Sequence, residues 1–250
     1  MTDATSAADL PGIAGESPDE RYRYDLSVDE LIARYGQLYT GAVYDVLDEM
    51  GLPNQALALE VKPLVRDTVL AGPAFTMKGI PDAGGSEELR LRRIEMFSAM
   101  KEVGVPLLDV RDTSADAQAA HYGEMNATVG RACGVIGAVV DGGCRDTRFL
   151  LERAFPVFCR YLLPVEAYGR WSYYDWQVPI GLRGALSSIV RVVPGDFLVG
   201  DIDGVVVIPH DLVTEVLAKT EELVALENEA RAEFEAGSDP VAVYKRYGRL

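Results

Sequence analysis

Apolar residues recur every three or four positions over several stretches of the chain, a spacing typical of helices that bury one face. Between 87 and 103 this spacing runs through Leu91, Ile94 and Phe97. A capping box that begins at Ser27 predicts the start of a shorter helix. Similar signals predict further helices at 40–50, 124–133, 146–153 and 210–236.

Short apolar runs typical of strands alternate with these helices. Four such runs are 69–77, 105–110, 135–140 and 156–158. After Pro164 three more follow without a helix between them, at 185–193, 196–199 and 205–208. The alternation predicts an α/β layered core, and the later strands need a second sheet or an extension of the first.

The two ends of the chain differ in character. Residues 1–23 are rich in small and polar residues without periodicity, so we expect a flexible tail. No repeat or linker interrupts the rest, and 24–250 is expected to form a single domain. The last long helix has Val216, Leu223 and Leu226 on one side and many Glu on the other, and it could reach a neighbouring subunit.

Composition narrows the class of protein. Hydrophobic residues make up 48% and charged residues 25% of the 250 positions, a globular balance. The formal net charge is -15, and no Lys/Arg stripe gathers the basic residues, so we expect no nucleic-acid partner. No segment has the features of a signal peptide or a membrane span, so we expect a cytoplasmic protein with no membrane contact. The 3 Cys residues form no CxxC pair, which argues against a disulfide framework or a structural zinc site.

The densest chemical signal lies between Gly123 and Asp146. A Gly-Gly pair, expected to form a turn with freedom for positive φ, follows the 135–140 strand and leads to Arg145-Asp146. A carboxylate at this point can hold a hard divalent cation, and the Arg can bind a carboxylate or a developing oxyanion. The alternative is that Arg145 and Asp146 only cap the next helix and form a surface ion pair.

The start of the 124–133 helix could belong to the same site. The amides of Met125 and Asn126 lie where a helix N-terminus can receive an anion, and Glu124 supplies a carboxylate beside them. Alternatively, Glu124 only interacts favourably with the helix dipole. His121 could line the pocket, although a structural hydrogen bond is the simpler use. The aromatic cluster 171–176 could shape a substrate or subunit surface, although we expect burial between layers.

These motifs together resemble a known family. A Gly followed by an acidic residue, then about twenty residues and Arg-Asp, is the hallmark of the 4-hydroxy-4-methyl-2-oxoglutarate/4-carboxy-4-hydroxy-2-oxoadipate aldolases, which share their fold with the regulator of ribonuclease activity A. Here the hallmark is Gly123-Glu124 and Arg145-Asp146. The resemblance extends from about 31 to 237 and includes the segments 71–76, 155–158, 194–196 and 203–209.

The resemblance implies a fold and a site. The fold would be a layered β/β/α sandwich of the swivelling phosphohistidine-domain type with a long C-terminal helix. Asp146 would ligate Mg²⁺ or Mn²⁺, Arg145 would contact substrate oxygens, and Glu124 would hold a metal-bound water. Gly123 and the amides of Met125 and Asn126 would bind the pyruvoyl carboxylate, although the family often has apolar residues at the last two positions. Glu227 would reach the metal site of the adjacent subunit in a homotrimer or homohexamer.

The implied activity is class II, metal-dependent cleavage of a 4-hydroxy-2-oxo acid to pyruvate and a carbonyl product. Decarboxylation of oxaloacetate forms the same enolate and is the nearest enzymatic alternative. The other alternative is a non-catalytic regulator that binds a ribonuclease or another protein, because a fold does not fix a function. Glu124 favours an enzyme, since a purely regulatory relative has no need of that carboxylate.

Overall fold

The computed structural model describes residues 20–82 and 84–248. Its strands are β1 (Lys62–Pro63), β2 (Leu70–Pro81), β3 (Leu107–Asp112), β4 (Ala120–Tyr122), β5 (Val135–Cys144), β6 (Val157–Leu162), β7 (Trp171–Trp176), β8 (Ile180–Leu182), β9 (Val190–Val192), β10 (Phe197–Asp201) and β11 (Gly204–Ile208). Its α-helices are α1 (Val28–Tyr35), α2 (Thr40–Glu49), α3 (Glu87–Val103), α4 (Glu124–Ala132), α5 (Thr147–Glu152), α6 (Val213–Glu235) and α7 (Pro240–Tyr247), with 3₁₀ turns η1 (Glu20–Tyr22) and η2 (His210–Leu212).

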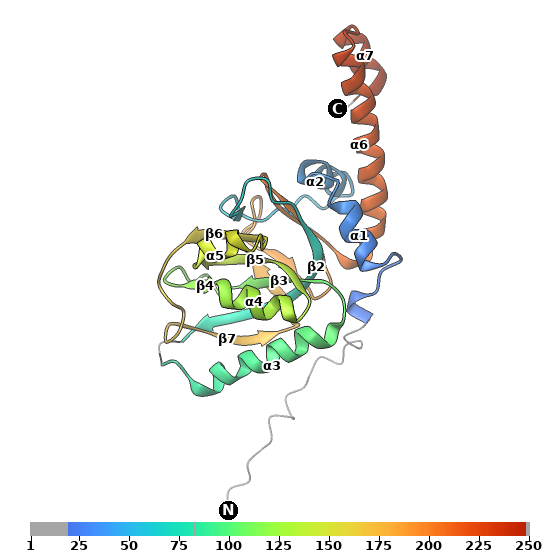
Figure 1. Ribbon diagram of the computed structural model, residues 1–250. Helices are drawn as coiled ribbons and strands as arrows, with labels where there is room; N and C mark the ends of the chain where they lie inside the picture. Colours follow the sequence, from blue (N-terminus) through green and yellow to red (C-terminus); the bar gives the residue numbers. More distant parts are fainter. Residues whose placement is uncertain (1–19, 83, 249–250) are drawn as a thin grey trace, which may run out of the picture.

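A mixed nine-stranded sheet forms the centre of the molecule (Figure 1). Its main path is β1-β6-β5-β3-β2-β10-β11, with β2, β3, β5 and β6 parallel to one another. The long strand β2 pairs with β10 through its first half and with β7 through its second half. Strands β8 and β9 form a separate two-stranded sheet.

The main sheet curls until its two ends approach each other. The Lys62 ammonium on β1 donates to the Asp203 carbonyl, 2.7 Å away in the turn between β10 and β11. Gly200 on β10 lies against the Phe158 ring on β6, since an added Cβ at Gly200 would lie 3.0 Å from that ring. The nearly closed sheet encloses an apolar core that includes Leu108, Val139 and Leu198.

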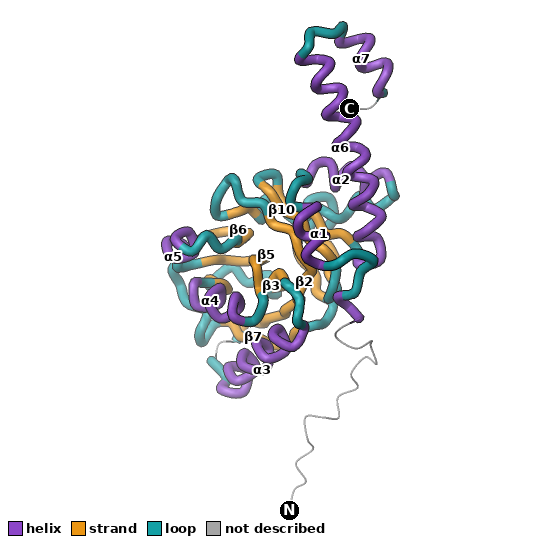
Figure 2. Tube along the Cα trace, turned by 45° about the vertical axis from the view of Figure 1, so that its right-hand side comes forward, coloured by secondary structure: helices purple, strands orange, loops and turns teal. Residues whose placement is uncertain are grey.

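Helices cover the outside of the sheet in two groups. Helices α3, α4 and α5 pack on the face that carries Phe75, Met77 and Val140. Helices α1, α2 and the first half of α6 cover β10 and β11. Figures 1 and 2 show that α6 then leaves the body, with α7 beside its far end. The expected α/β architecture and long C-terminal helix are therefore confirmed.

Several expected boundaries differ from the observed ones. Gly142 and Gly143 belong to strand β5 and form no turn, and neither has a positive φ. The expected strand at 185–193 is reduced to β9, and the aromatic cluster 171–176 is itself strand β7. Residues 1–19 of the expected tail lie outside the described residues. Structure begins earlier than residue 24, because the side chain of Tyr22 in η1 is buried in the core.

The bounds of α3 and the cap at Ser27 agree closely with the sequence-based expectations. Helix α3 spans the predicted 87–103, and the hydroxyl of Ser27 accepts a hydrogen bond from the Glu30 amide at 3.2 Å, as the capping box requires. Across the described part of the chain, no helix has both the length and the apolar content needed to cross a bilayer.

Candidate active site

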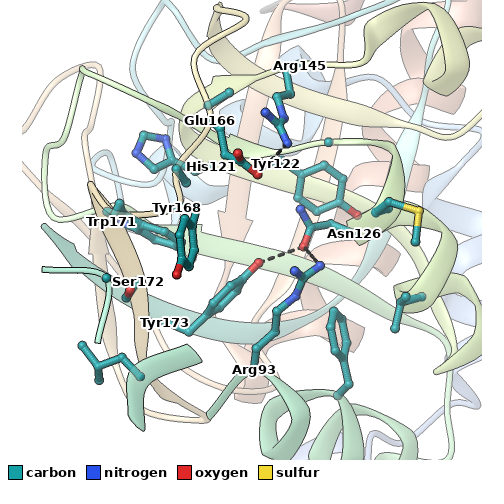
Figure 3. Close-up of a pocket in the computed structure, with 18 of the residues that line it drawn as sticks. Arg93, His121, Tyr122, Asn126, Arg145, Glu166, Tyr168, Trp171, Ser172 and Tyr173 are labelled. Carbon is teal, nitrogen blue, oxygen red and sulfur yellow. Dashed lines mark hydrogen bonds and ion pairs between the residues drawn. The ribbon is translucent and has the colours of Figure 1, made fainter. Parts of the chain in front are cut away.

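A pocket with a cavity volume of about 530 Å³ opens between helices α3 and α4, strand β7 and the loop that follows β6 (Figure 3). Strands β5 and β6 are parallel neighbours, so their carboxyl ends meet at this edge of the sheet. Ligands of α/β proteins favour such an edge. The residues that the sequence singled out and that line this pocket include Gly123, Met125, Asn126, Arg145, Asp146 and His121.

Arg145 and Asp146 follow the last residue of β5. The Arg145 amide donates to the Tyr122 carbonyl at 3.0 Å, which fixes the chain as it leaves the sheet. Asp146 adopts the left-handed conformation with φ 56° and is the N-cap residue of α5. The Arg145 guanidinium lies between two carboxylates, with Nε 3.6 Å from Asp146 Oδ2 and Nη2 3.2 Å from Glu166 Oε1. A cation flanked by two partly exposed carboxylates thus forms one side of the pocket.

Gly123 leaves room for the close approach of the Asp146 side chain. An added Cβ at Gly123 would lie 2.8 Å from Asp146 Oδ2 and 3.3 Å from Arg145 Cγ. Its φ of -164° is ordinary extended backbone, so conformational freedom is not the reason for glycine here. The Gly and the Arg-Asp pair, more than twenty residues apart in sequence, therefore contact each other directly.

The first turn of α4 offers backbone donors to the pocket. The Asn126 amide donates to the Gly123 carbonyl at 3.0 Å, and the Ala127 amide approaches the same oxygen at 3.2 Å. Within the described residues, the amides of Glu124 and Met125 have no such acceptor. The expected contact between a substrate carboxylate and the Asn126 amide would have to share or replace an existing hydrogen bond.

Two of the expected acidic residues point elsewhere in this chain. Glu124 Oε1 lies 3.0 Å from Arg153 Nη2 and accepts from the Thr128 hydroxyl at 2.7 Å, and Glu124 does not line the pocket. Glu227 lies on α6, where its carboxylate contacts the Tyr39 hydroxyl. Figures 1 and 2 both show α6 on the opposite side of the body from α3 and β7. Within one chain, Glu227 is thus remote from the pocket.

A buried ion pair supports the pocket wall from behind. Arg111 and Asp109 on β3 are fully buried and form a two-point interaction, with distances of 2.9 Å and 2.6 Å. Arg111 Nη1 also donates to the His121 carbonyl at 2.7 Å and to the Tyr173 hydroxyl at 3.1 Å. The Arg111 guanidinium lies over the Tyr122 ring, 4.5 Å from its centroid. Three pocket residues are therefore held by one buried cation.

His121 lines the pocket and is also a structural hydrogen bonder, so both of its expected uses are found. Its Nε2 lies 2.8 Å from Asp116 Oδ2, and its Nδ1 accepts from the Gly143 amide at 3.1 Å. Burial lowers the pKa of the imidazole below its ordinary value, against the opposing effect of Asp116. A neutral ring that donates through Nε2 satisfies both contacts.

The pocket also contains functional groups that sequence reasoning missed. Glu166 follows β6, so its position at the carboxyl end of a strand parallel to β5 was a usable signal. Arg93 comes from the middle of α3 and belongs to no motif. Tyr173 belongs to the aromatic cluster 171–176, in which only Trp171 is buried as expected, and Trp171, Ser172 and Tyr173 line the pocket. Behind the pocket wall, Asp109 and Arg111 alternate within an apolar strand, which is the pattern of two polar side chains on one buried face.

The carboxylates at the pocket suit a cation that keeps several water ligands better than one bound entirely by protein side chains. Within residues 20–82 and 84–248, no group of three or more His, Cys, Asp or Glu side chains is arranged to hold a metal. Mg²⁺ is commonly bound through one or two carboxylates and completes its shell with water and substrate. Asp146, with Glu166 near it, fits that kind of site.

Comparison with known proteins identifies the family. The RraA-like family model, described as Aldolase/RraA, matches residues 40–207. The chain belongs to the Aldolase/RraA family. A Halalkalibacterium halodurans protein of this kind, named "Putative 4-hydroxy-4-methyl-2-oxoglutarate aldolase", is 32% identical over 218 residues, which cover 87% of this chain and 93% of that protein.

Solved structures of similar fold include two informative examples. One of them carries the description "Crystal structure of novel cellulases from microbes associated with the gut ecosystem". It is 36% identical in sequence, with a TM-score of 0.75, and the match covers 83% of this chain and 89% of that one. The Streptomyces coelicolor protein RraAS2, described as an unusual member of the RNase ES inhibitor RraA family, is 22% identical, with a TM-score of 0.67 over 84% and 99% of the two chains. At that identity the second likeness concerns the fold alone.

Proposed function

We propose that this Aldolase/RraA protein is a divalent-metal-dependent aldolase that cleaves a 4-hydroxy-2-oxo acid to pyruvate and a carbonyl product. The observation that carries the proposal is the convergence of Gly123, Arg145 and Asp146 on one pocket, with the first turn of α4 beside them. The 32% identical relative with an aldolase name supports the same reaction class. Oxaloacetate decarboxylation could use the same groups.

Asp146 is the residue that would hold the cation, with Glu166 as the nearby second carboxylate. A bound Mg²⁺ or Mn²⁺ would supply a Lewis acid for the 2-oxo group of the substrate. Arg145 donates from a fixed position to the oxygen on which negative charge develops. The free amides of the first turn of α4 bind the substrate carboxylate at the positive end of the helix.

Bond cleavage requires removal of the 4-hydroxyl proton. The C3–C4 bond then breaks, its electron pair forms the pyruvate enolate, and C4 becomes the carbonyl carbon of the second product. A water held by a carboxylate can accept the proton. The family resemblance assigns that water to Glu124, while the contact between Glu166 and Arg145 makes Glu166 a second candidate. No Schiff-base Lys is required.

A substrate panel tests the proposal. Pyruvate release is measured with several 4-hydroxy-2-oxo acids and with oxaloacetate, with Mg²⁺, with Mn²⁺ and after thorough chelation. We expect turnover of at least one hydroxy acid, its loss on chelation, and its return when either metal is restored. Cello-oligosaccharides serve as a further arm, measured by the release of reducing sugar, because the gut-microbe relative is described among cellulases. Absence of both pyruvate and reducing-sugar release would favour a binding protein, and full pyruvate release after chelation would exclude the metal-dependent reaction.

A further inference from the structure

Arg93 extends from α3 into the pocket and faces the Arg145 side across it in Figure 3. Its Nη2 donates to Asn126 Oδ1 at 3.2 Å. Its guanidinium lies over the rings of Phe97 and Tyr173, at 5.4 Å and 5.7 Å from their centroids. The pocket therefore contains two guanidinium groups, and the proposed aldol chemistry uses only Arg145.

The two guanidinium groups differ in their counter-charges. Arg145 lies beside both Asp146 and Glu166, whereas no ion pair involving Arg93 is found in the described part of the chain. The Arg93 Nε atom is buried and has no hydrogen-bond partner among the described residues. A partly desolvated cation without a carboxylate is costly, and an anionic ligand would remove that cost.

Asn126 holds Arg93 in this orientation. Asn126 Oδ1 accepts from Arg93 and, at 2.8 Å, from the Tyr173 hydroxyl. The Tyr173 hydroxyl in turn accepts from Arg111, which the fully buried Asp109 fixes. A continuous set of hydrogen bonds thus connects Arg93 to the rigid core. The Asn126 side chain therefore has a specific use, because it fixes the Arg93 guanidinium against Tyr173.

We propose that Arg93, oriented by Asn126, binds a second anionic group at the far end of the ligand, so that the pocket selects 2-oxo diacids over 2-oxo acids with an apolar end. The planar guanidinium matches the geometry of a carboxylate. The inference rests on the proposed function only in placing the 2-oxo acid end beside Arg145 and Asp146. The exposed side chains of Ile94 and Met125 at the same pocket would instead favour an apolar end, and that preference is the competing outcome.

Calorimetric binding of two isosteric ligands tests the selection without requiring turnover. 2-Oxoglutarate carries a terminal carboxylate where 5-methyl-2-oxohexanoate carries an isopropyl group of similar shape. Both are titrated into the full chain at one fixed Mg²⁺ concentration. Wild type should bind the diacid more tightly. Arg93→Met should weaken diacid binding about 10- to 100-fold, as expected for loss of a hydrogen bond to a charged group, and leave the apolar ligand within about 3-fold.

Matched variants separate a specific contact from a general charge effect. Arg92→Met removes the same charge from the same helix, where Arg92 lies over the Tyr174 and Trp176 rings outside the pocket. It should leave the selectivity unchanged. Asn126→Leu should reduce the selectivity for the diacid in part, and Arg93→Lys should retain an intermediate preference. These two variants still decide the matter if Arg93→Met does not fold.

The outcomes distinguish this inference from the proposed function. Equal weakening of both ligands by Arg93→Met, an equal effect of Arg92→Met, or a wild-type preference for the apolar ligand would each overturn the role of Arg93. So would failure of wild type to bind either acid. If the diacid preference and its loss are observed but no hydroxy acid is cleaved, the aldolase proposal fails and the anion site stands. If a hydroxy acid is cleaved but the diacid is not preferred, the aldolase proposal stands and the anion site fails.

Discussion

The buried pair of Asp109 and Arg111 shows how one interaction in the core can support part of a pocket wall. Both side chains have no exposed surface, and Arg111 holds the His121 carbonyl and the Tyr173 hydroxyl. Removing only one partner of such a pair leaves an uncompensated charge in the core. Replacing both partners by apolar residues removes that problem, although it also removes the support of the pocket wall.

We therefore expect Arg111→Met to lower the free energy of unfolding by about 3–5 kcal/mol. The double variant Asp109→Leu/Arg111→Met should lose clearly less than Arg111→Met alone, because no buried carboxylate remains unpaired. Urea unfolding of wild type, both single variants and the double variant measures the difference. A double variant as unstable as the sum of the two single variants would contradict this account of the pair.

Arg145 and Asp146 should differ in their kinetic effects. Asp146→Asn keeps the size of the side chain and removes the charge that would hold the cation, so the concentration of Mg²⁺ needed for half-maximal activity should rise. Arg145→Ala removes a donor to developing charge, and kcat should fall about 10²-fold or more. Steady-state kinetics over a Mg²⁺ series measures both. Near-normal kinetics in both variants would move the chemistry away from this end of β5.

Glu124 and Glu166 compete for the same chemical role, and matched amide substitutions separate them. Glu124 is bound by Arg153 and Thr128, whereas Glu166 contacts Arg145 inside the pocket. If Glu166 holds the water, Glu166→Gln should slow aldol cleavage at least 10-fold while Glu124→Gln has a small effect. The opposite result would mean that the Glu124 carboxylate leaves Arg153 when substrate binds. Thermal unfolding of both variants controls for folding.

At the scale of single elements, local sequence signals predicted the helix ends that local interactions determine. Helix α3 has its predicted bounds because Ser86 caps its first turn and Gly104, in the left-handed conformation, ends it. Strand β5 continued past its predicted end because Gly142 and Gly143 serve tertiary contacts. An added Cβ would lie 2.4 Å from His121 Nδ1 at Gly142 and 2.3 Å from the Tyr161 ring at Gly143. Sequence alone does not reveal which side chain approaches.

The sequence predicted the part of the candidate site that lies in a local motif, and it did not predict the residues that only tertiary contacts bring there. Gly123 and Arg145-Asp146 form a motif, and both lie at one pocket because strand β5 returns the chain to the start of α4. Arg93 belongs to no motif and Tyr173 only to the aromatic cluster 171–176, and their contact depends on β7 pairing with the far half of β2. That pairing is possible because Gly79 leaves room for the Trp171 ring, whose nearest atom would be 1.8 Å from an added Cβ.

The close contacts of β5 lead to a stability prediction. Gly142→Ala forces a methyl group against His121 and Thr113, and it should lower the free energy of unfolding by about 1–3 kcal/mol. Gly41→Ala on helix α2 is the control, because its nearest atom would be 3.5 Å away in the Tyr39 ring. That change should be neutral or stabilise by up to about 1 kcal/mol. Equal loss in both variants, measured by urea unfolding, would show that steric crowding in β5 is not the cause.

For the whole molecule, the outer half of α6 raises the question of assembly. Buried residues of α6 occur mainly in its first two turns, through Val213, Val216 and Leu217. Farther out, Leu226 is 52% exposed, and Tyr244 on α7 is 58% exposed. Exposed apolar side chains gathered on an extension of this kind are typical of a contact with another chain. Since Glu227 lies on this extension, remote from the pocket of its own chain, any role in the site requires a neighbouring subunit.

If α6 brings Glu227 to the pocket of the next subunit in a ring, Asp146→Ala and Glu227→Ala should complement each other. A head-to-tail interface joins different surfaces of each chain, so every site combines one Asp146 with the Glu227 of a neighbour. After co-refolding of an equal mixture, random assembly rebuilds intact sites at about one quarter of positions, one half for each of the two chains. A site within one chain would rebuild none.

Pyruvate release measures the recovery, with each variant refolded separately and wild type refolded under the same conditions as controls. Light scattering establishes that rings form, and differently tagged variants establish that they are mixed. No recovery in proven mixed rings would exclude Glu227 from the shared site, whereas recovery toward one quarter would require it there.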